Sequence, residues 1–125
     1  MPLLMIHSLP PIDLDAIPRM LADVRDSGAR ALKCSPSNIW VMFNPVAPGC
    51  YVQGETPASV PQQDTHPPVV IARAQAGRQP AEREAFVSSV AAAVGRGLCV
   101  PPANVWIYYE EMRSADVWFE GHWAG

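Results

Sequence analysis

The stretch Ser35–Val41 (SPSNIWV) returns later in the chain as Pro101–Ile107 (PPANVWI). The two stretches begin 66 positions apart, at 35 and 101, and the same spacing carries Pro2 onto Pro68. A constant spacing that holds from the start of a segment to its end is typical of a duplicated unit. The chain is therefore predicted to contain two copies of one structural unit.

Each copy has the pattern of a strand, a long helix and a second strand. In the first copy, residues 2–9 are largely apolar, residues 16–33 carry apolar side chains near helical spacing, and residues 38–43 are again largely apolar. The corresponding ranges in the second copy are 69–75, 80–98 and 104–109. A helix of roughly 18 residues is long enough to connect two parallel strands, and such connections are right-handed.

These patterns predict an α/β (α+β) fold. Two fused β-α-β units are expected to form one four-stranded sheet with both helices on one face. The chain is short enough for residues 1–125 to be one domain. Within it we assign repeat 1 to residues 2–53, a Pro-, Ser- and Thr-rich linker to residues 54–67, and repeat 2 to residues 68–125.

The composition argues against several classes of function. The formal net charge is -3 and nine residues are Lys or Arg, whereas nucleic-acid binding needs clustered basic residues. No segment approaches the ~20 apolar residues of a membrane span, and the N-terminus lacks the basic start of a signal peptide. The cysteines and histidines show no spacing typical of a metal or redox site. We therefore expect a cytoplasmic protein without nucleic-acid, membrane or metal partners.

Three further features carry a resemblance to a known family. Pro2 directly follows Met1, Gly77-Arg78 lies just beyond the first strand of the second copy, and that copy continues with Val100–Met112 (VPPANVWIYYEEM). Together with the duplication, these features resemble the tautomerase superfamily, the relatives of 4-oxalocrotonate tautomerase. The likeness is to the fused members, such as the malonate semialdehyde decarboxylases and cis-3-chloroacrylic acid dehalogenases. It implies a tautomerase/MIF-like fold, an enzyme that needs no cofactor, and a homotrimer.

Pro2 is the candidate general base. Methionine is normally removed before a residue as small as proline, and removal of Met1 would leave a free secondary amine on a rigid ring. The apolar residues Leu3–Ile6 indicate an apolar pocket, which disfavours the protonated amine and lowers its pKa. A base that titrates near neutrality suits proton abstraction next to a carbonyl group. Pro68 is internal and its nitrogen is an amide, so each chain has at most one such site.

The resemblance also implies residues that bind substrate. Arg78 is the second candidate catalytic residue, because family members use an arginine here to hold a substrate carboxylate, which a planar guanidinium binds well. Arg73 and Gln75 alternate along one strand and are expected to share a face, where they are candidates to contact a carboxylate or carbonyl. Tyr51 and Trp118 lie near positions of pocket aromatic residues in the family. The expected substrate is a small carboxylate.

Departures from the family leave more than one reaction open. Trp40 and Trp106 stand where single-unit tautomerases have an arginine, Ala29 where cis-dehalogenases have a histidine, and Ile39 where decarboxylases have an aspartate. The favoured reaction is therefore keto–enol proton transfer on a small 2-oxo or 2-hydroxydienoic carboxylate. The alternatives are hydration, dehalogenation or decarboxylation of small unsaturated or 3-oxo acids, and a non-catalytic trimer.

Overall fold

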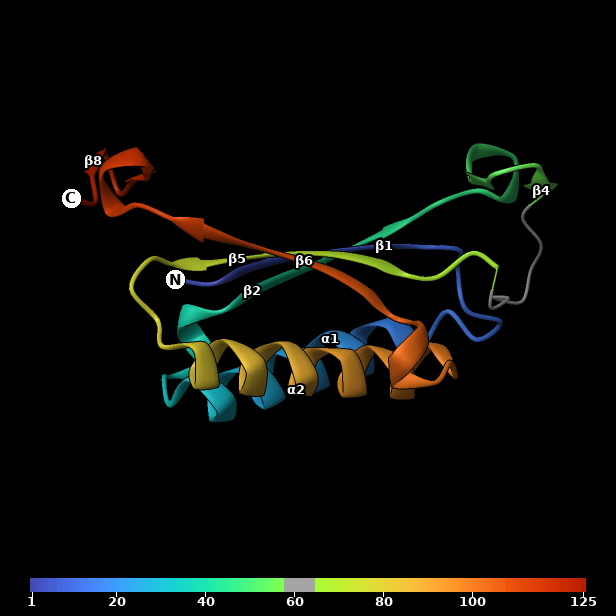
Figure 1. Ribbon diagram of the computed structural model, residues 1–125, viewed down its shortest axis with the longest axis horizontal. Coiled ribbons are helices and arrows are strands. Elements are labelled where there is room, and N and C mark those ends of the chain that lie inside the picture. Colours follow the sequence, from blue (N-terminus) through green and yellow to red (C-terminus); the bar gives the residue numbers. More distant parts are fainter. Residues whose placement is uncertain (58–64) are drawn as a thin grey trace.

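The chain forms one sheet of four strands with two long helices packed against the same face (Figure 1). The computed structural model describes residues 1–57 and 65–125. The elements in chain order are β1 (Leu3–Ser8), α1 (Ala16–Leu32), η1 (Pro36–Asn38), β2 (Trp40–Pro45), η2 (Pro48–Cys50), β3 (Val52–Gln53), β4 (Thr56–Pro57), β5 (Val69–Gln75), α2 (Pro80–Leu98), η3 (Pro102–Asn104), β6 (Trp106–Met112), η4 (Ser114–Asp116), β7 (Trp118–Phe119) and β8 (His122–Trp123).

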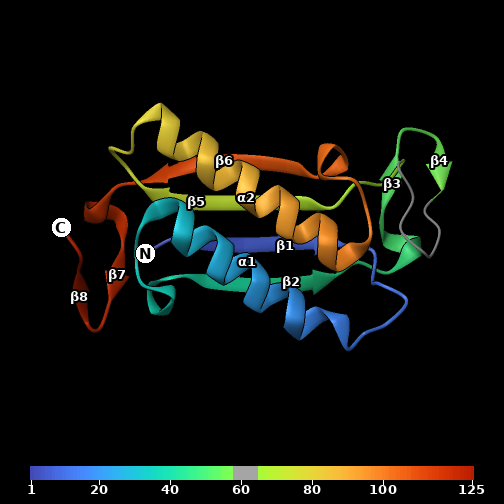
Figure 2. The ribbon, with the colours of Figure 1, turned by 90° about the horizontal axis from the view of Figure 1, so that it is seen from below.

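The four strands follow the order β2-β1-β5-β6. Within each half the two strands are parallel and are joined by a helix, α1 between β1 and β2 and α2 between β5 and β6. The halves meet along β1 and β5, which pair antiparallel with Leu3 opposite Arg73. The predicted fold, two β-α-β units in one four-stranded sheet with both helices on one face, is confirmed (Figure 2).

The element boundaries repeat with the spacing seen in the sequence. β2 begins at Trp40 and β6 begins at Trp106, 66 positions later. Both long helices end at a residue with left-handed backbone, Lys33 with φ 54° and Cys99 with φ 58°, which are also 66 positions apart. The same local geometry therefore recurs at equivalent positions of the two halves, although the residues at these helix ends differ.

The second strand of each half begins later than predicted. The sequence pattern predicts a strand from Asn38, but the structure has the short helix η1 there and starts β2 at Trp40. Pro36 opens this helix, and its ring presets the backbone for a helical first position. The hydroxyl of Ser35 also accepts a hydrogen bond from the Ser37 amide at 3.3 Å, which favours a turn over a strand.

Two short hairpins extend beyond the main sheet at its opposite ends (Figure 1). β3 pairs antiparallel with β4 at one end, and β7 pairs antiparallel with β8 at the other. The predicted linker, residues 54–67, begins inside the first hairpin, and its residues 58–64 lie outside the described part of the chain.

The core lies between the helices and one face of the sheet. Side chains alternate along the strands, so Leu4 and Ile6 of β1 and Val70 of β5 point toward the helices and are completely buried. Phe86 of α2 is the largest of the fully buried side chains among the described residues. Its ring lies so close to Gly28 of α1 that a Cβ atom added to this glycine would be 3.0 Å from a ring carbon atom. Glycine at this position therefore permits the close approach of the two helices. No helix among the described residues is long and apolar enough to cross a membrane.

The opposite face of the sheet carries large apolar side chains without a covering layer in the described chain. Trp40 and Met42 of β2 and Trp106 and Tyr108 of β6 point to this face and are 44–53% exposed. Monomeric proteins rarely leave an extended apolar patch in water. This face, which we call the open face, is therefore suited to contact with another protein molecule.

One ion pair links the two helices. Arg96 of α2 donates to both carboxylate oxygens of Asp23 in α1, at 2.9 and 3.0 Å. The hydrogen bond from Arg96 is the main cause that holds the pKa of Asp23 below its usual value. Both side chains are partly exposed, so water screens the pair and limits its contribution to stability.

Candidate functional site

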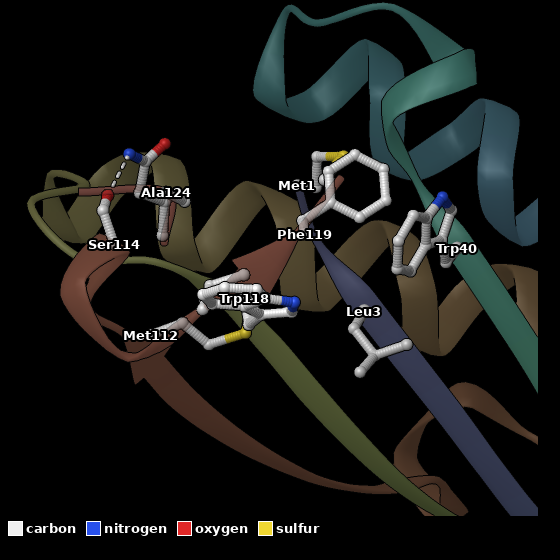
Figure 3. Close-up of a pocket in the computed structure, with 10 residues that line it drawn as sticks. Met1, Leu3, Trp40, Met112, Ser114, Trp118, Phe119 and Ala124 are labelled. Atoms are coloured by element: carbon white, nitrogen blue, oxygen red, sulfur yellow. Dashed lines mark hydrogen bonds between the residues drawn. The ribbon is translucent and has the colours of Figure 1, made fainter. Parts of the chain in front are cut away.

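A cavity of about 270 Å³ lies at the end of the sheet where β1 and β2 begin and β5 and β6 end (Figure 3). The β7–β8 hairpin lies at this end, close to the N-terminus of the chain, and forms part of the cavity wall (Figure 2). The volume is just below the ~300–1,000 Å³ of pockets for drug-sized ligands, so it suits a smaller molecule. The cavity is lined by Met1, Leu3, Trp40, Gln75, Met112, Ser114, Val117, Trp118, Phe119 and Ala124.

Aromatic side chains make up much of the cavity wall. The ring of Phe119, in the β7–β8 hairpin, meets Trp40 of β2 edge to face, with ring centroids 5.3 Å apart. Trp118 packs in the same manner against Trp123, with centroids 5.2 Å apart. The hairpin turns back at Gly121, whose φ of 82° is readily adopted only by glycine. The wall therefore depends on a tight hairpin that meets the edge strand of the sheet.

Two polar side chains of the lining lie together and form what we call the polar corner. Gln75 Nε2 donates a hydrogen bond to Ser114 Oγ at 3.2 Å. A backbone hydrogen bond also joins the two segments, because the Ala76 amide donates to the Met112 carbonyl at 2.9 Å. Among the described residues, none of the ten that line the cavity has a charged side chain. The cavity thus has an apolar body and one uncharged polar corner.

Pro2 is buried between two residues that line this cavity. Its carbonyl accepts a hydrogen bond from the Trp40 amide at 3.0 Å, which joins the start of β1 to β2. Met1, which is 40% exposed, precedes Pro2 and lines the cavity, and Leu3 follows on the other side. With Met1 attached, the Pro2 nitrogen is an amide. Loss of Met1 would turn that nitrogen into an amine and open to it the space that Met1 fills.

The equivalent end of the second unit is closed by the chain itself. Pro67 stands there in the position of Met1, and its carbonyl accepts a hydrogen bond from the Tyr51 hydroxyl at 2.7 Å. The neighbouring His66 is completely buried, with Nδ1 2.9 Å from a threonine hydroxyl and Nε2 3.1 Å from a threonine carbonyl. Burial raises the pKa of the Tyr51 phenol. Pro68 therefore lies at a closed end of the sheet, and its own nitrogen is an amide. The two ends of the sheet are chemically different.

The two predicted arginines lie outside the lining of the cavity. Arg78 is in the turn between β5 and α2, and its Nη1 lies 3.4 Å from the carbonyl oxygen of Leu32 and 3.5 Å from a carboxylate oxygen of Glu82. Arg73, on the open face, has its Nε 3.6 Å from a carboxylate oxygen of Glu110. These distances are at or beyond the long limit of good hydrogen bonds, so both guanidinium groups are loosely held.

The predicted site residues are therefore only partly gathered by the fold. Gln75 and Trp118 line the cavity beside Pro2. The two arginines lie outside the lining, and Tyr51 lies at the opposite end of the sheet in the same chain. A site that used all of these residues at once would need a change of side-chain conformation or a second protomer.

Ser114 and Phe119 are among the lining residues that sequence reasoning did not identify. The duplication does not indicate them, because the equivalent positions of the first unit are Pro48 and Gln53, whose side chains have different chemistry. The hydrogen bond that joins Ser114 to the end of β5 connects distant parts of the chain. No local sequence pattern indicates it.

No protein-family model and no curated protein sequence matches the chain. A solved structure described as "R7 fused 4-OT wild type asymmetric trimer" is similar with a TM-score of 0.85 and 16% identity, covering 98% of this chain and 95% of that chain. Pt0534 inactivated by 2-oxo-3-pentynoate has a TM-score of 0.85 and 12% identity, with 98% and 94% covered. N1, a member of the cis-3-chloroacrylic acid dehalogenase family, has a TM-score of 0.76 and 17% identity, with 98% and 83% covered. At these identities the similarity establishes the fold, in agreement with the sequence resemblance.

Proposed function

We propose that the chain is a member of the tautomerase superfamily and a cofactor-free tautomerase whose general base is the amine of Pro2. The observation that carries the proposal is the position of Pro2, buried at the start of β1 with both sequence neighbours in the lining of one cavity. The similar folds of fused 4-OT support it. Removal of Met1 would place a secondary amine in the wall of that cavity.

In the proposed reaction Pro2 moves one proton between two atoms of the substrate. The amine takes the proton of the enol hydroxyl, the electron pair shifts through the conjugated system, and the resulting ammonium group protonates a carbon atom. The product is the 2-oxo acid, and no atom or electron is gained or lost. The apolar lining disfavours the ammonium form and lowers the pKa of the amine, which makes it a better-matched base near neutral pH.

The substrate carboxylate is proposed to bind at the polar corner formed by Gln75 and Ser114. An amide N–H and a hydroxyl can both donate hydrogen bonds to a carboxylate. We propose Arg78, three residues beyond Gln75, as a further ligand that leaves its loose contacts when substrate binds. Arg73 shares the open face with Gln75 and stays a candidate for a contact from that side. A role for Tyr51 requires that it come from another protomer.

We also propose that the chain assembles as a homotrimer. The open face exposes large apolar side chains along both edge strands, and burial of such surface favours association. Solved structures of similar fold are described as fused 4-OT trimers. Sedimentation at micromolar protein concentration is expected to give the mass of three chains. A stable monomer at that concentration would contradict the assembly.

The alternative reactions find less support in the site. Hydration and dehalogenation need a group that activates water, and no Asp, Glu or His is among the described residues that line the cavity. Ala29 and Ile39, which stand where relatives have a histidine and an aspartate, are 3% and 5% exposed and belong to the core. Proton transfer by Pro2 needs neither group, so tautomerisation is the reaction that the geometry supports best.

2-Oxo-3-pentynoate provides a direct test of the proposed base. Pt0534 is described as inactivated by this compound, whose alkyne is conjugated to a ketone and is open to addition of an amine. In this protein the amine of Pro2 is expected to add to the alkyne, with its proton passing to the neighbouring carbon. The intact mass should then rise by one whole reagent per chain, and peptide mapping should place the adduct on Pro2.

Three variants sharpen this labelling experiment. Pro68→Ala is expected to be labelled at the wild-type rate, because the nitrogen of Pro68 is an amide in either protein. Gln75→Ala and Arg78→Ala are expected to slow labelling without changing its position, because the reagent's carboxylate loses a ligand. Retention of Met1 in the mature protein, or labelling only elsewhere, contradicts the proposed base and favours the non-catalytic trimer.

A further inference from the structure

We propose that the cavity selects small ligands with one carboxylate and an apolar body, and that it discriminates against dicarboxylates. The inference rests on the proposed function, because it specifies the substrate class of the same site. It follows from how polarity is distributed over the lining. The donors are gathered in the polar corner formed by Gln75 and Ser114, and the hydrocarbon and aromatic side chains make up the rest.

The polar corner has donors for a single carboxylate. The amide nitrogen of Gln75 carries two hydrogens and gives one to Ser114, so the second hydrogen and the serine hydroxyl hydrogen are available to a ligand. Arg78 follows Gln75 by three residues and lies outside the lining. A 2-oxo acid can therefore place its charged end at this corner without any charged group elsewhere in the lining.

The remainder of the described lining has no cationic side chain for a second carboxylate, and the proposed reaction uses the Pro2 amine as a neutral base. Trp40, Phe119 and Leu3 present aromatic and aliphatic surface, and Trp118 adds a further ring. A carboxylate moved from water to such surface without a partner loses its hydration at high cost. Arg73, the other predicted cation, lies outside the lining, with its Nε 3.6 Å from a carboxylate oxygen of Glu110. An aromatic ring in the same place would instead gain contacts with these rings.

Binding of two unreactive probes tests the inference without requiring turnover. The probes are 3-phenylpropanoate, with one carboxylate and a phenyl ring, and adipate, with a carboxylate at each end. Both are titrated calorimetrically into the mature protein, with tryptophan fluorescence as a second readout because Trp40 and Trp118 line the cavity. We expect 3-phenylpropanoate to bind at least about tenfold more tightly. Equal binding, or tighter binding of adipate, overturns the inference.

The duplication supplies a matched pair of variants for the same titration. Trp40→Arg places a cation on the apolar wall, at an edge-strand position that also belongs to the open face. Trp106→Arg makes the same change 66 positions later, at the start of β6 beside Val69 and so at the opposite end of the sheet. We expect Trp40→Arg to reduce the preference for 3-phenylpropanoate about tenfold or more, and Trp106→Arg to leave it unchanged. Equal effects of the two variants contradict selection by the cavity wall.

The outcomes separate this inference from the proposed function. Labelling of Pro2 together with tighter adipate binding would support the tautomerase proposal and contradict the proposed substrate class. Selective binding of 3-phenylpropanoate without labelling of Pro2 keeps the binding preference and removes the catalytic proposal. When both hold, phenylenolpyruvate is expected to be ketonised with a higher kcat/KM than 2-hydroxymuconate.

Discussion

Replacement of Pro2 by alanine is expected to lower kcat/KM for the ketonisation of phenylenolpyruvate by about 10²-fold or more, the scale of a positioned general base. Alanine also leaves a free amine once Met1 is removed, so a small residual rate is expected. That amine is primary and is no longer held by a ring. The measurement is the ultraviolet absorbance of the enol, followed for wild type and variant at equal protein concentration.

Pro68→Ala is the matched control for this variant. Pro68 occupies the equivalent position 66 residues later and is also buried, but its nitrogen lies within the chain and cannot accept a proton. We expect Pro68→Ala to keep kcat/KM within a few-fold of wild type, and both variants to sediment like wild type. Full activity of Pro2→Ala would rule out the proline base, whereas equal losses in both variants would point to a structural role for the two prolines.

Replacement of Phe86 by alanine is expected to lower the free energy of unfolding by about 3–5 kcal/mol, the range for a buried phenylalanine. The side chain is completely buried between the helices and the sheet, where its ring contacts Gly28 of α1 and stacks edge to face with Tyr109 at 6.4 Å. Its removal leaves a cavity that the helices cannot close without moving. Urea unfolding at one fixed protein concentration measures the loss, because assembly also contributes to stability.

Ile12→Ala is the control for Phe86→Ala. Ile12 is also a large apolar residue, but it is 79% exposed, and substitutions at such surface positions usually change stability by less than about 0.5 kcal/mol. A loss below about 1 kcal/mol for Phe86→Ala would mean that the helix–helix contact is not part of the stabilising core.

The fold was accessible from sequence because its determinants are local and are repeated. The repeat of SPSNIWV as PPANVWI set the unit length, and the spacing of apolar residues indicated strand, helix and strand in each copy. A helix between two strands of one sheet then dictates parallel pairing. The later start of β2 was missed because the capping geometry of Ser35 and Pro36 outweighs the apolar pattern there.

The candidate site was accessible only in part. Pro2 was predicted from the sequence because its proposed chemistry depends on a covalent feature, the secondary amine that loss of Met1 would leave, and not on tertiary contacts. The contact of Gln75 with Ser114 could not be identified, because it depends on how the end of β5 meets the chain after β6. Arg78 was identified by its position, but the direction of its guanidinium depends on where α1 ends.

By itself, the sequence determined that this protein is a duplicated β-α-β chain, and it made Pro2 the candidate base. Repetition and periodicity are properties of the chain alone, so no tertiary contact is needed to see them. Only the tertiary structure decided which end of the sheet is open. Residues 65–67 close the end at Pro68, with the Pro67 carbonyl held by Tyr51, whereas both sequence neighbours of Pro2 line the cavity. The tertiary structure also made the cavity apolar, because packing of the β7–β8 hairpin brings Phe119 against Trp40 and leaves the charged residues outside the lining.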